Sequence, residues 1–185
     1  MKVQAALNKG LLEYRNGQTM AATKDLSTAL EYDPENETAL TARAAASIKN
    51  NNLYQADQDL NKLEKMPSGN SVESKKLRED YHQHYRMEKQ KLDEADKRIE
   101  ENPSDTAAWR IKAQSARHIG DFQQAEYAAN TLLGVDPSSV AALSTLRAIS
   151  RFLPDSLKLQ NRANLGSSRL NQTNRNLQLN KPGGN

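Results

Sequence analysis

The chain has 185 residues, 36% of them hydrophobic and 26% charged, with 26 lysines and arginines, 23 aspartates and glutamates, and no cysteine. This composition predicts a modest, highly charged protein with enough chain for a core, and it excludes thiol catalysis, disulfide frameworks and cysteine-based zinc sites. The sequence shows neither the ~18 consecutive apolar residues of a membrane span nor the apolar run of a signal peptide, so we expect a cytoplasmic protein, or a periplasmic one if it is a fragment of a longer exported chain.

Four prolines occur at nearly constant intervals along the chain. Pro34, Pro67, Pro103 and Pro137 are separated by 33, 36 and 34 residues. Between them, apolar residues at spacings of three and four predict pairs of helices. A period of about 34 residues predicts helical hairpins, and because one hairpin cannot cover its own apolar face, the hairpins must stack.

The first predicted unit covers residues 3–36. Gly10, Ala22 and Ala29 are small residues that allow two helices to approach closely, because a larger side chain would hold the axes apart. Gly17 suits a tight turn with left-handed backbone geometry, and Pro34 follows the second helix, which it cannot continue.

The second predicted unit covers residues 37–70. Leu53, Ala56, Leu60 and Leu63 form one apolar stripe at helical spacing. Three asparagines, residues 50–52, occupy the place of the turn glycine, and asparagine tolerates the same left-handed geometry.

The third predicted unit, residues 71–105, departs from this pattern. It has no turn glycine and few small packing residues, and its apolar positions form one narrow stripe, which consists of Leu77, Tyr81, Tyr85, Leu92, Ala95 and Ile99. Two interpretations compete: a degenerate repeat bent near Arg86–Lys89, or one long helix that partly bridges two half-solenoids. We favour the degenerate repeat, because the interval between Pro67 and Pro103 is almost a normal period.

The fourth predicted unit, residues 106–139, shows the repeat most clearly. Its characteristic residues are Trp109, Ala113, Gly120, Phe122, Ala125 and Pro137. Residues 140–152 follow with apolar side chains at helical spacing and predict a capping helix. With this pattern, the chain resembles a tetratricopeptide repeat (TPR) protein over residues 3–152. The resemblance implies an all-α solenoid of about four helical hairpins with a C-terminal capping helix.

Residues 153–185 carry the basic charge of the chain. This segment has five lysines and arginines against Asp155 alone, a net charge of +4, so residues 1–152 carry about −1. Its Asn- and Gln-rich composition predicts disorder from about residue 166, with one short helix near Asp155–Asn164. We interpret it as a solvated linker in preference to a nucleic-acid-binding arm.

The sequence contains few residues that could act in catalysis. His82 and His84 are two residues apart and point in opposite directions on a helix, so they cannot chelate one ion together. The acidic pairs at residues 79–80 and 100–101 are interpreted as solvated charge, and no phosphate-binding loop or nucleophile motif is present. We therefore predict a protein that is not an enzyme and uses no metal or cofactor.

The resemblance implies that ligands bind in a concave groove lined by the first helix of each unit. The side chains of these first helices that do not pack in the core form the candidate site. They are Asn8, Leu11, Tyr14, Arg15, Thr41, Ala45, Ile48, Lys49, Arg110, Gln114, Arg117 and His118. The charged members are all basic, which favours an acidic or carboxylate-bearing peptide or helix as partner.

The predicted function is a non-catalytic protein-binding scaffold, which we place by resemblance in a bacterial assembly or secretion system. One alternative is a dedicated assembly chaperone that holds a hydrophobic partner segment, with an apolar groove formed by Leu7, Leu11, Ala42, Ala45 and Ile48. A third class, nucleic-acid binding through the basic tail, predicts an affinity that falls steeply with added salt. Partner identity and oligomeric state are left open by the sequence.

Overall fold

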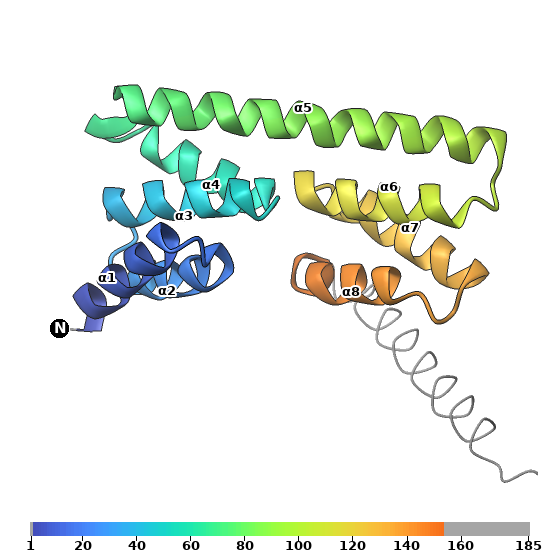
Figure 1. The fold of residues 1–185 in the computed structure, drawn as a ribbon, viewed down its shortest axis with the longest axis horizontal. Helices are drawn as coiled ribbons and strands as arrows, with labels where there is room; N and C mark the ends of the chain where they lie inside the picture. Colours follow the sequence, from blue (N-terminus) through green and yellow to red (C-terminus); the bar gives the residue numbers. More distant parts are fainter. Residues whose placement is uncertain (1, 154–185) are drawn as a thin grey trace, which may run out of the picture. The chain divides into compact units, whose positions relative to one another are not determined.

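The computed structural model describes residues 2–153, and every regular element in this range is a helix (Figure 1). The predicted all-α fold of helical hairpins is confirmed. The disorder expected from about residue 166 and the helix expected near Asp155–Asn164 lie outside the described residues. Among the helices of residues 2–153, none combines the length and apolar character needed to cross a membrane.

Eight α-helices and two short 3-10 helices follow one another along residues 2–153. In chain order they are α1 (Lys2–Arg15), α2 (Thr19–Tyr32), α3 (Glu37–Lys49), α4 (Leu53–Leu63), η1 (Pro67–Asn70), α5 (Val72–Glu101), α6 (Thr106–Ile119), α7 (Phe122–Val135), α8 (Val140–Ile149) and η2 (Ser150–Phe152). The chain divides into two compact units, the first ending at Glu88 and the second beginning at Lys89, so the division falls inside α5.

The first unit packs α1, α2, α3 and α4 in sequence, with each helix against the next and α1 also touching α3 (Figure 1). Its core contains Leu26 and Leu60 together with the fully buried alanines Ala22 and Ala56. A Cβ atom on Gly10 would lie 2.7 Å from Cγ of Leu26. Small residues therefore do allow the close helix contacts that the sequence predicts.

The turns within the hairpins use the left-handed backbone that the sequence predicts. Gly17 has φ of 76°, Gly120 has φ of 88°, and Asn51 has φ of 53°. The helices that follow two of these turns begin with a capping side chain: Asn52 accepts a hydrogen bond from the Gln55 amide, and Asp121 accepts one from the Gln124 amide. Asparagine thus replaces glycine in the turn of the second hairpin.

Helix α5 is the main difference from the expected pattern. It runs without a break over 30 residues, Val72–Glu101, and the bend expected near Arg86–Lys89 is absent. The physical reason is local: this segment contains no glycine, proline or asparagine, and nothing in it favours a turn over continued helix. The long-helix alternative therefore describes residues 72–101. Leu77 and Tyr81 are buried in the first half, and Leu92 and Ala95 in the second.

The second unit consists of the later half of α5 with α6, α7 and α8. Its core joins Leu92 to the inner faces of these helices and includes Leu132, Leu146 and Ile149. Trp109 is 5% exposed and donates a hydrogen bond from Nε1 to the carbonyl oxygen of Pro103, 2.8 Å away. Helix α8 buries its apolar face in this core, and its role as a capping helix stays a prediction.

Candidate ligand groove of the first unit

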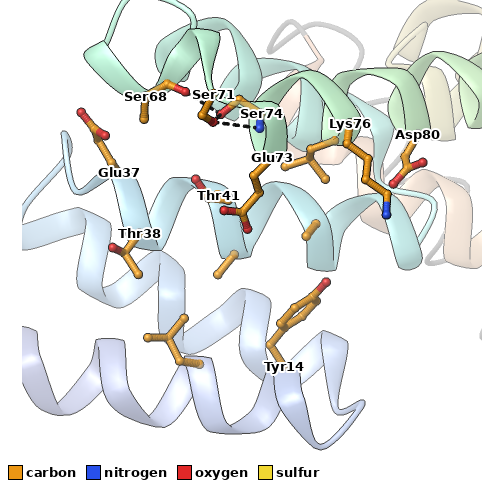
Figure 2. Close-up of a pocket in the computed structure, with 14 residues that line it drawn as sticks. Tyr14, Glu37, Thr38, Thr41, Ser68, Ser71, Glu73, Ser74, Lys76 and Asp80 are labelled. Carbon is orange, nitrogen blue, oxygen red and sulfur yellow. Dashed lines mark hydrogen bonds between the residues drawn. The ribbon is translucent and has the colours of Figure 1, made fainter.

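An open cavity of about 590 Å³ lies in the first unit, against α1, α3 and the start of α5 (Figure 2). Its walls come from three helices and from the short connection around η1. The lining residues are Leu11, Tyr14, Glu37, Thr38, Thr41, Ala42, Ala45, Ser68, Ser71, Glu73, Ser74, Lys76, Leu77 and Asp80. We call this cavity the groove. Its volume is within the range of ligand-binding pockets, roughly 300–1,000 Å³.

Apolar side chains of all three helices contribute to the groove. Leu11 comes from α1, Ala42 and Ala45 from α3, and Leu77 from α5. Figure 2 shows the Tyr14 ring rising from α1 at one end of this surface. The two alanines keep the wall formed by α3 low, because their side chains are short, and so leave open space between the helices.

Charged residues reach the groove mainly from α5. Glu73, Lys76 and Asp80 lie at positions −4, −1 and +3 relative to the buried Leu77, so helical geometry places them on or beside the same face. Figure 2 shows Glu73 extending from α5 toward Thr41 of α3. Leu77, which anchors α5 in the core, therefore also directs these charged side chains toward the groove.

The connection around η1 closes one end of the groove with serines. The Oγ atom of Ser71 accepts a hydrogen bond from the Ser74 amide, and Oγ of Ser74 donates to the carbonyl oxygen of Ser68 at 2.9 Å (Figure 2). The Oγ atom of Ser68 is buried and has no hydrogen-bond partner within the described structure. The hydrogen bonds of Ser71 and Ser74 therefore hold this connection in place at the end of the groove.

The charge of the groove is negative. Glu37, Glu73 and Asp80 contribute three carboxylates and Lys76 one ammonium group, a net charge of −2. None of these four side chains forms an ion pair within residues 2–153. Elsewhere in the first unit the buried carboxylate of Asp59 is fully paired. Unpaired carboxylates beside an apolar surface favour a ligand that carries positive charge.

Four of the candidate site residues line the groove. They are Leu11, Tyr14, Thr41 and Ala45. Lys49 is adjacent but occupied: its Nζ lies 4.7 Å from the centre of the Tyr14 ring, a cation–π contact. Its charge is therefore partly committed to a neighbour within the protein.

The other candidates of the first unit lie outside the groove. Ile48 is 3% exposed and belongs to the core, so its expected role as an exposed apolar contact is wrong. Ile48 lies four residues after the fully buried Ala44, so helical geometry turns its side chain toward the core instead of the open face. Asn8 and Arg15 are exposed, and Asn8 accepts a hydrogen bond from the Gln4 side chain.

The remaining candidates, Arg110, Gln114, Arg117 and His118, all belong to α6 in the second unit. Arg110 is exposed, and Gln114 is partly exposed. Nη2 of Arg117 lies 2.7 Å from Nε2 of His118. These residues are not part of the groove in the first unit.

The sequence-based prediction misses the acidic members of the groove. It interprets Asp80 as solvated charge and gives Glu73 no role. The spacing of Glu73 and Asp80 from Leu77 indicates that these acids share a helix face with it. This places them in the groove only if α5 is recognised as the helix that lines the groove after α1 and α3. All of these residues precede residues 86–89, so the signal does not depend on whether the segment bends there.

No group of three or more histidine, aspartate or glutamate side chains is placed to hold a metal ion within residues 2–153. His84 Nδ1 is 2.9 Å from the carbonyl oxygen of Asp80, and the His82 ring meets the Tyr81 ring edge-on. Both histidines therefore interact with neighbouring residues of α5.

The consecutive helical hairpins, their buried alanines and the groove on the first helices define a TPR-like helical repeat protein. Two solved structures similar to this chain are the ArsTM double mutant of MamA RS-1 and a TPR protein of Thermus thermophilus. The first is 13% identical, with 92% of this chain and 96% of that chain covered and a TM-score of 0.40. The second is 18% identical, with 91% and 99% covered and a TM-score of 0.42. No protein-family model and no curated protein matches the chain.

Proposed function

We propose that the protein is a non-catalytic interaction scaffold whose first unit binds a peptide segment or partner helix in the groove. The observation that carries this proposal is the open cavity of about 590 Å³ with an apolar surface contributed by α1, α3 and α5. An extended segment or a helix that places apolar side chains on Leu11 and Leu77 would bury them against the core of the repeat.

The charge of the groove refines the class of partner. The cations expected on the first helices favour an acidic peptide, but the residues that line the groove carry three carboxylates against Lys76. Lys49 contacts Tyr14, and Arg15 lies outside. We therefore propose a basic, amphipathic segment with lysines or arginines beside apolar side chains.

The chaperone alternative needs a larger open apolar surface. Of the residues named for it, Leu7, Ala42 and Ile48 are all buried to more than nine-tenths in the first unit. What stays open is an apolar strip bordered by charge, which suits an amphipathic segment better than a wholly hydrophobic one. The setting of a bacterial assembly or secretion system stays a prediction.

Two fluorescent peptides of equal length test this function on the full chain, one built from lysine and leucine and the other from glutamate and leucine. We expect the lysine peptide to bind about tenfold more tightly in a polarisation titration, because only its charge complements the groove. Tighter binding of the glutamate peptide would restore the acidic partner that the sequence favours.

Substitutions on both walls locate the binding. Glu37→Lys/Glu73→Lys should weaken the lysine peptide about tenfold, from roughly 0.5–1 kcal/mol for each exposed charge. The control Glu31→Lys/Glu79→Lys makes the same change in net charge at exposed positions that do not line the groove and should leave affinity within about twofold. Equal losses in the two double variants would mean that only overall charge matters.

A third variant tests the space of the groove without changing its charge. Thr38 is exposed and lines the groove, so Thr38→Trp should fill it and weaken the lysine peptide at any salt concentration. Unchanged affinity in Thr38→Trp, with a normal circular dichroism melt, would place the peptide elsewhere.

A further inference from the structure

The segment that follows the described structure has the chemistry that the groove selects. Residues 154–185 contain Lys158, Arg162, Arg169, Arg175 and Lys181 against the single acid Asp155, a net charge of +4. Leucines stand next to two of these cations, in the sequences Leu157-Lys158-Leu159 and Arg169-Leu170. The segment thus pairs basic with apolar side chains at close intervals.

The groove offers the complementary surface on the same chain. Its three carboxylates have no ion-pair partner within residues 2–153, and the apolar side chains of Leu11 and Leu77 line the same groove. Residues 1–152 carry about −1 in total, whereas the residues that line the groove carry −2.

A covalent connection strengthens even a weak attraction. A segment tethered to its binding site experiences an effective concentration on the order of 1 mM when the tether can span the distance. A groove with a dissociation constant near ~1 mM for this segment would then be occupied about half of the time. The groove of a second copy can be occupied in the same way at high protein concentration.

We propose that the basic C-terminal segment, residues 154–185, binds the groove of the first unit and competes there with external partners. The competition rests on the proposed function, whereas occupancy of the groove by the segment can be tested alone. The segment supplies the lysines, arginines and leucines that the groove's carboxylates and apolar side chains would contact.

The absence of cysteine makes a direct test possible in the full chain. Ser168→Cys introduces a single thiol in the middle of the segment, and a nitroxide attached there broadens the NMR signals of nearby backbone amides. We expect selective broadening at Thr38, Thr41, Ala45 and residues 73–80, relative to the same sample with the nitroxide reduced. Broadening that is absent from these amides, or spread evenly over the surface, would overturn the proposal.

Charge reversal supplies the matched control. In the Glu37→Lys/Glu73→Lys background the groove broadening should fall to the level of the reduced sample, whereas Glu31→Lys/Glu79→Lys should retain it. About 0.5 M salt should also reduce it, because exposed charges are screened over a few ångströms at that concentration. Broadening that persists equally in both double variants would show that the groove carboxylates do not hold the segment.

The same amides separate this inference from the proposed function. Loss of label-induced broadening together with normal binding of the lysine peptide would reject the C-terminal segment as occupant and leave the peptide-binding function in place. Broadening of the groove amides without any binding of the lysine peptide would support the C-terminal segment as occupant and reject the proposed peptide-binding function. Mixing nitroxide-labelled unenriched protein with unlabelled ¹⁵N-enriched protein shows whether the occupied groove belongs to a second copy, and either arrangement supports the proposal.

Discussion

Gly69 shows how one missing side chain shapes the groove. A Cβ atom at this position would lie 2.4 Å from the carbonyl oxygen of Leu63 and 2.8 Å from Cα of Glu64. Both are backbone atoms and cannot move aside as a flexible side chain would. The close approach places η1 against the end of α4, and with it the serines that close one end of the groove.

Two glycine substitutions should therefore have opposite effects. We expect Gly69→Ala to lower the free energy of unfolding by about 1–3 kcal/mol, the usual range for overpacking. Gly134→Ala in α7 should raise it by up to about 1 kcal/mol, because a Cβ atom added there would meet nothing within 4 Å and alanine favours helix. Urea melts followed by circular dichroism measure both. A stabilised Gly69→Ala variant would contradict the close approach.

At the scale of elements, a buried ion pair joins α3 to α4. Arg43 donates from Nε and Nη2 to the two carboxylate oxygens of Asp59, at 2.9 and 2.6 Å. Arg43 also donates to Ser27 of α2, and Gln55 donates to Asp59. Because the side chain of Asp59 is only 1% exposed, its charge depends on these partners.

Removing one member of this pair should cost far more than replacing both. We expect Asp59→Leu alone to lower the free energy of unfolding by about 3–5 kcal/mol, since it leaves Arg43 without its counter-charge. The double variant Arg43→Met/Asp59→Leu should recover most of the loss. Additive losses in this double-mutant cycle, measured by denaturant titration, would mean that the two side chains do not act as a pair.

The junction between α5 and α6 should respond to acid. Hydrogen bonding by the Ala108 amide, and next by the Arg98 side chain, lowers the pKa of Asp105 below its usual value. A lowered folded-state pKa stabilises the protein above the unfolded pKa, near ~4, and this stabilisation is lost as the pH falls through the folded value. Asp105→Asn keeps a capping side chain without the charge.

We therefore expect wild type to exceed Asp105→Asn in unfolding free energy at about pH 6, and the difference to shrink as the pH falls below about 4. Denaturant melts of the two proteins across this range measure it. A difference that is constant with pH would show that the carboxylate charge contributes nothing at this junction.

At the scale of the whole molecule, the two units have their own cores, and the only tryptophan, Trp109, lies in the second. Helical repeats gain stability mainly from local contacts, so damage to one unit should be felt there first. We expect Leu26→Ala in the first unit, a loss of about 2–5 kcal/mol, to lower the midpoint seen by circular dichroism more than that seen by Trp109 fluorescence.

Leu132→Ala in the second unit is the matched variant and should move the fluorescence midpoint directly. If both variants shift the two signals equally, the chain unfolds in one cooperative step.

Spacing along the chain was enough to predict the helical hairpins. Prolines at regular intervals, buried alanines such as Ala22 and Ala125, and a left-handed Asn51 are local features, and each follows from the geometry of one turn or one helix contact. The candidate site was predictable only where a residue's role followed from its own helix, as for Leu11, Tyr14 and Thr41.

The sequence by itself determined the class of fold, because helical period and turn chemistry act over a few residues. Only the tertiary structure decided that the face of α5 carrying Glu73 and Asp80 lines the groove, since the packing of Leu77 sets the rotation of that helix. The sign of the groove's charge depends on this rotation. Helices that are distant in sequence create the site together, and no single segment specifies it.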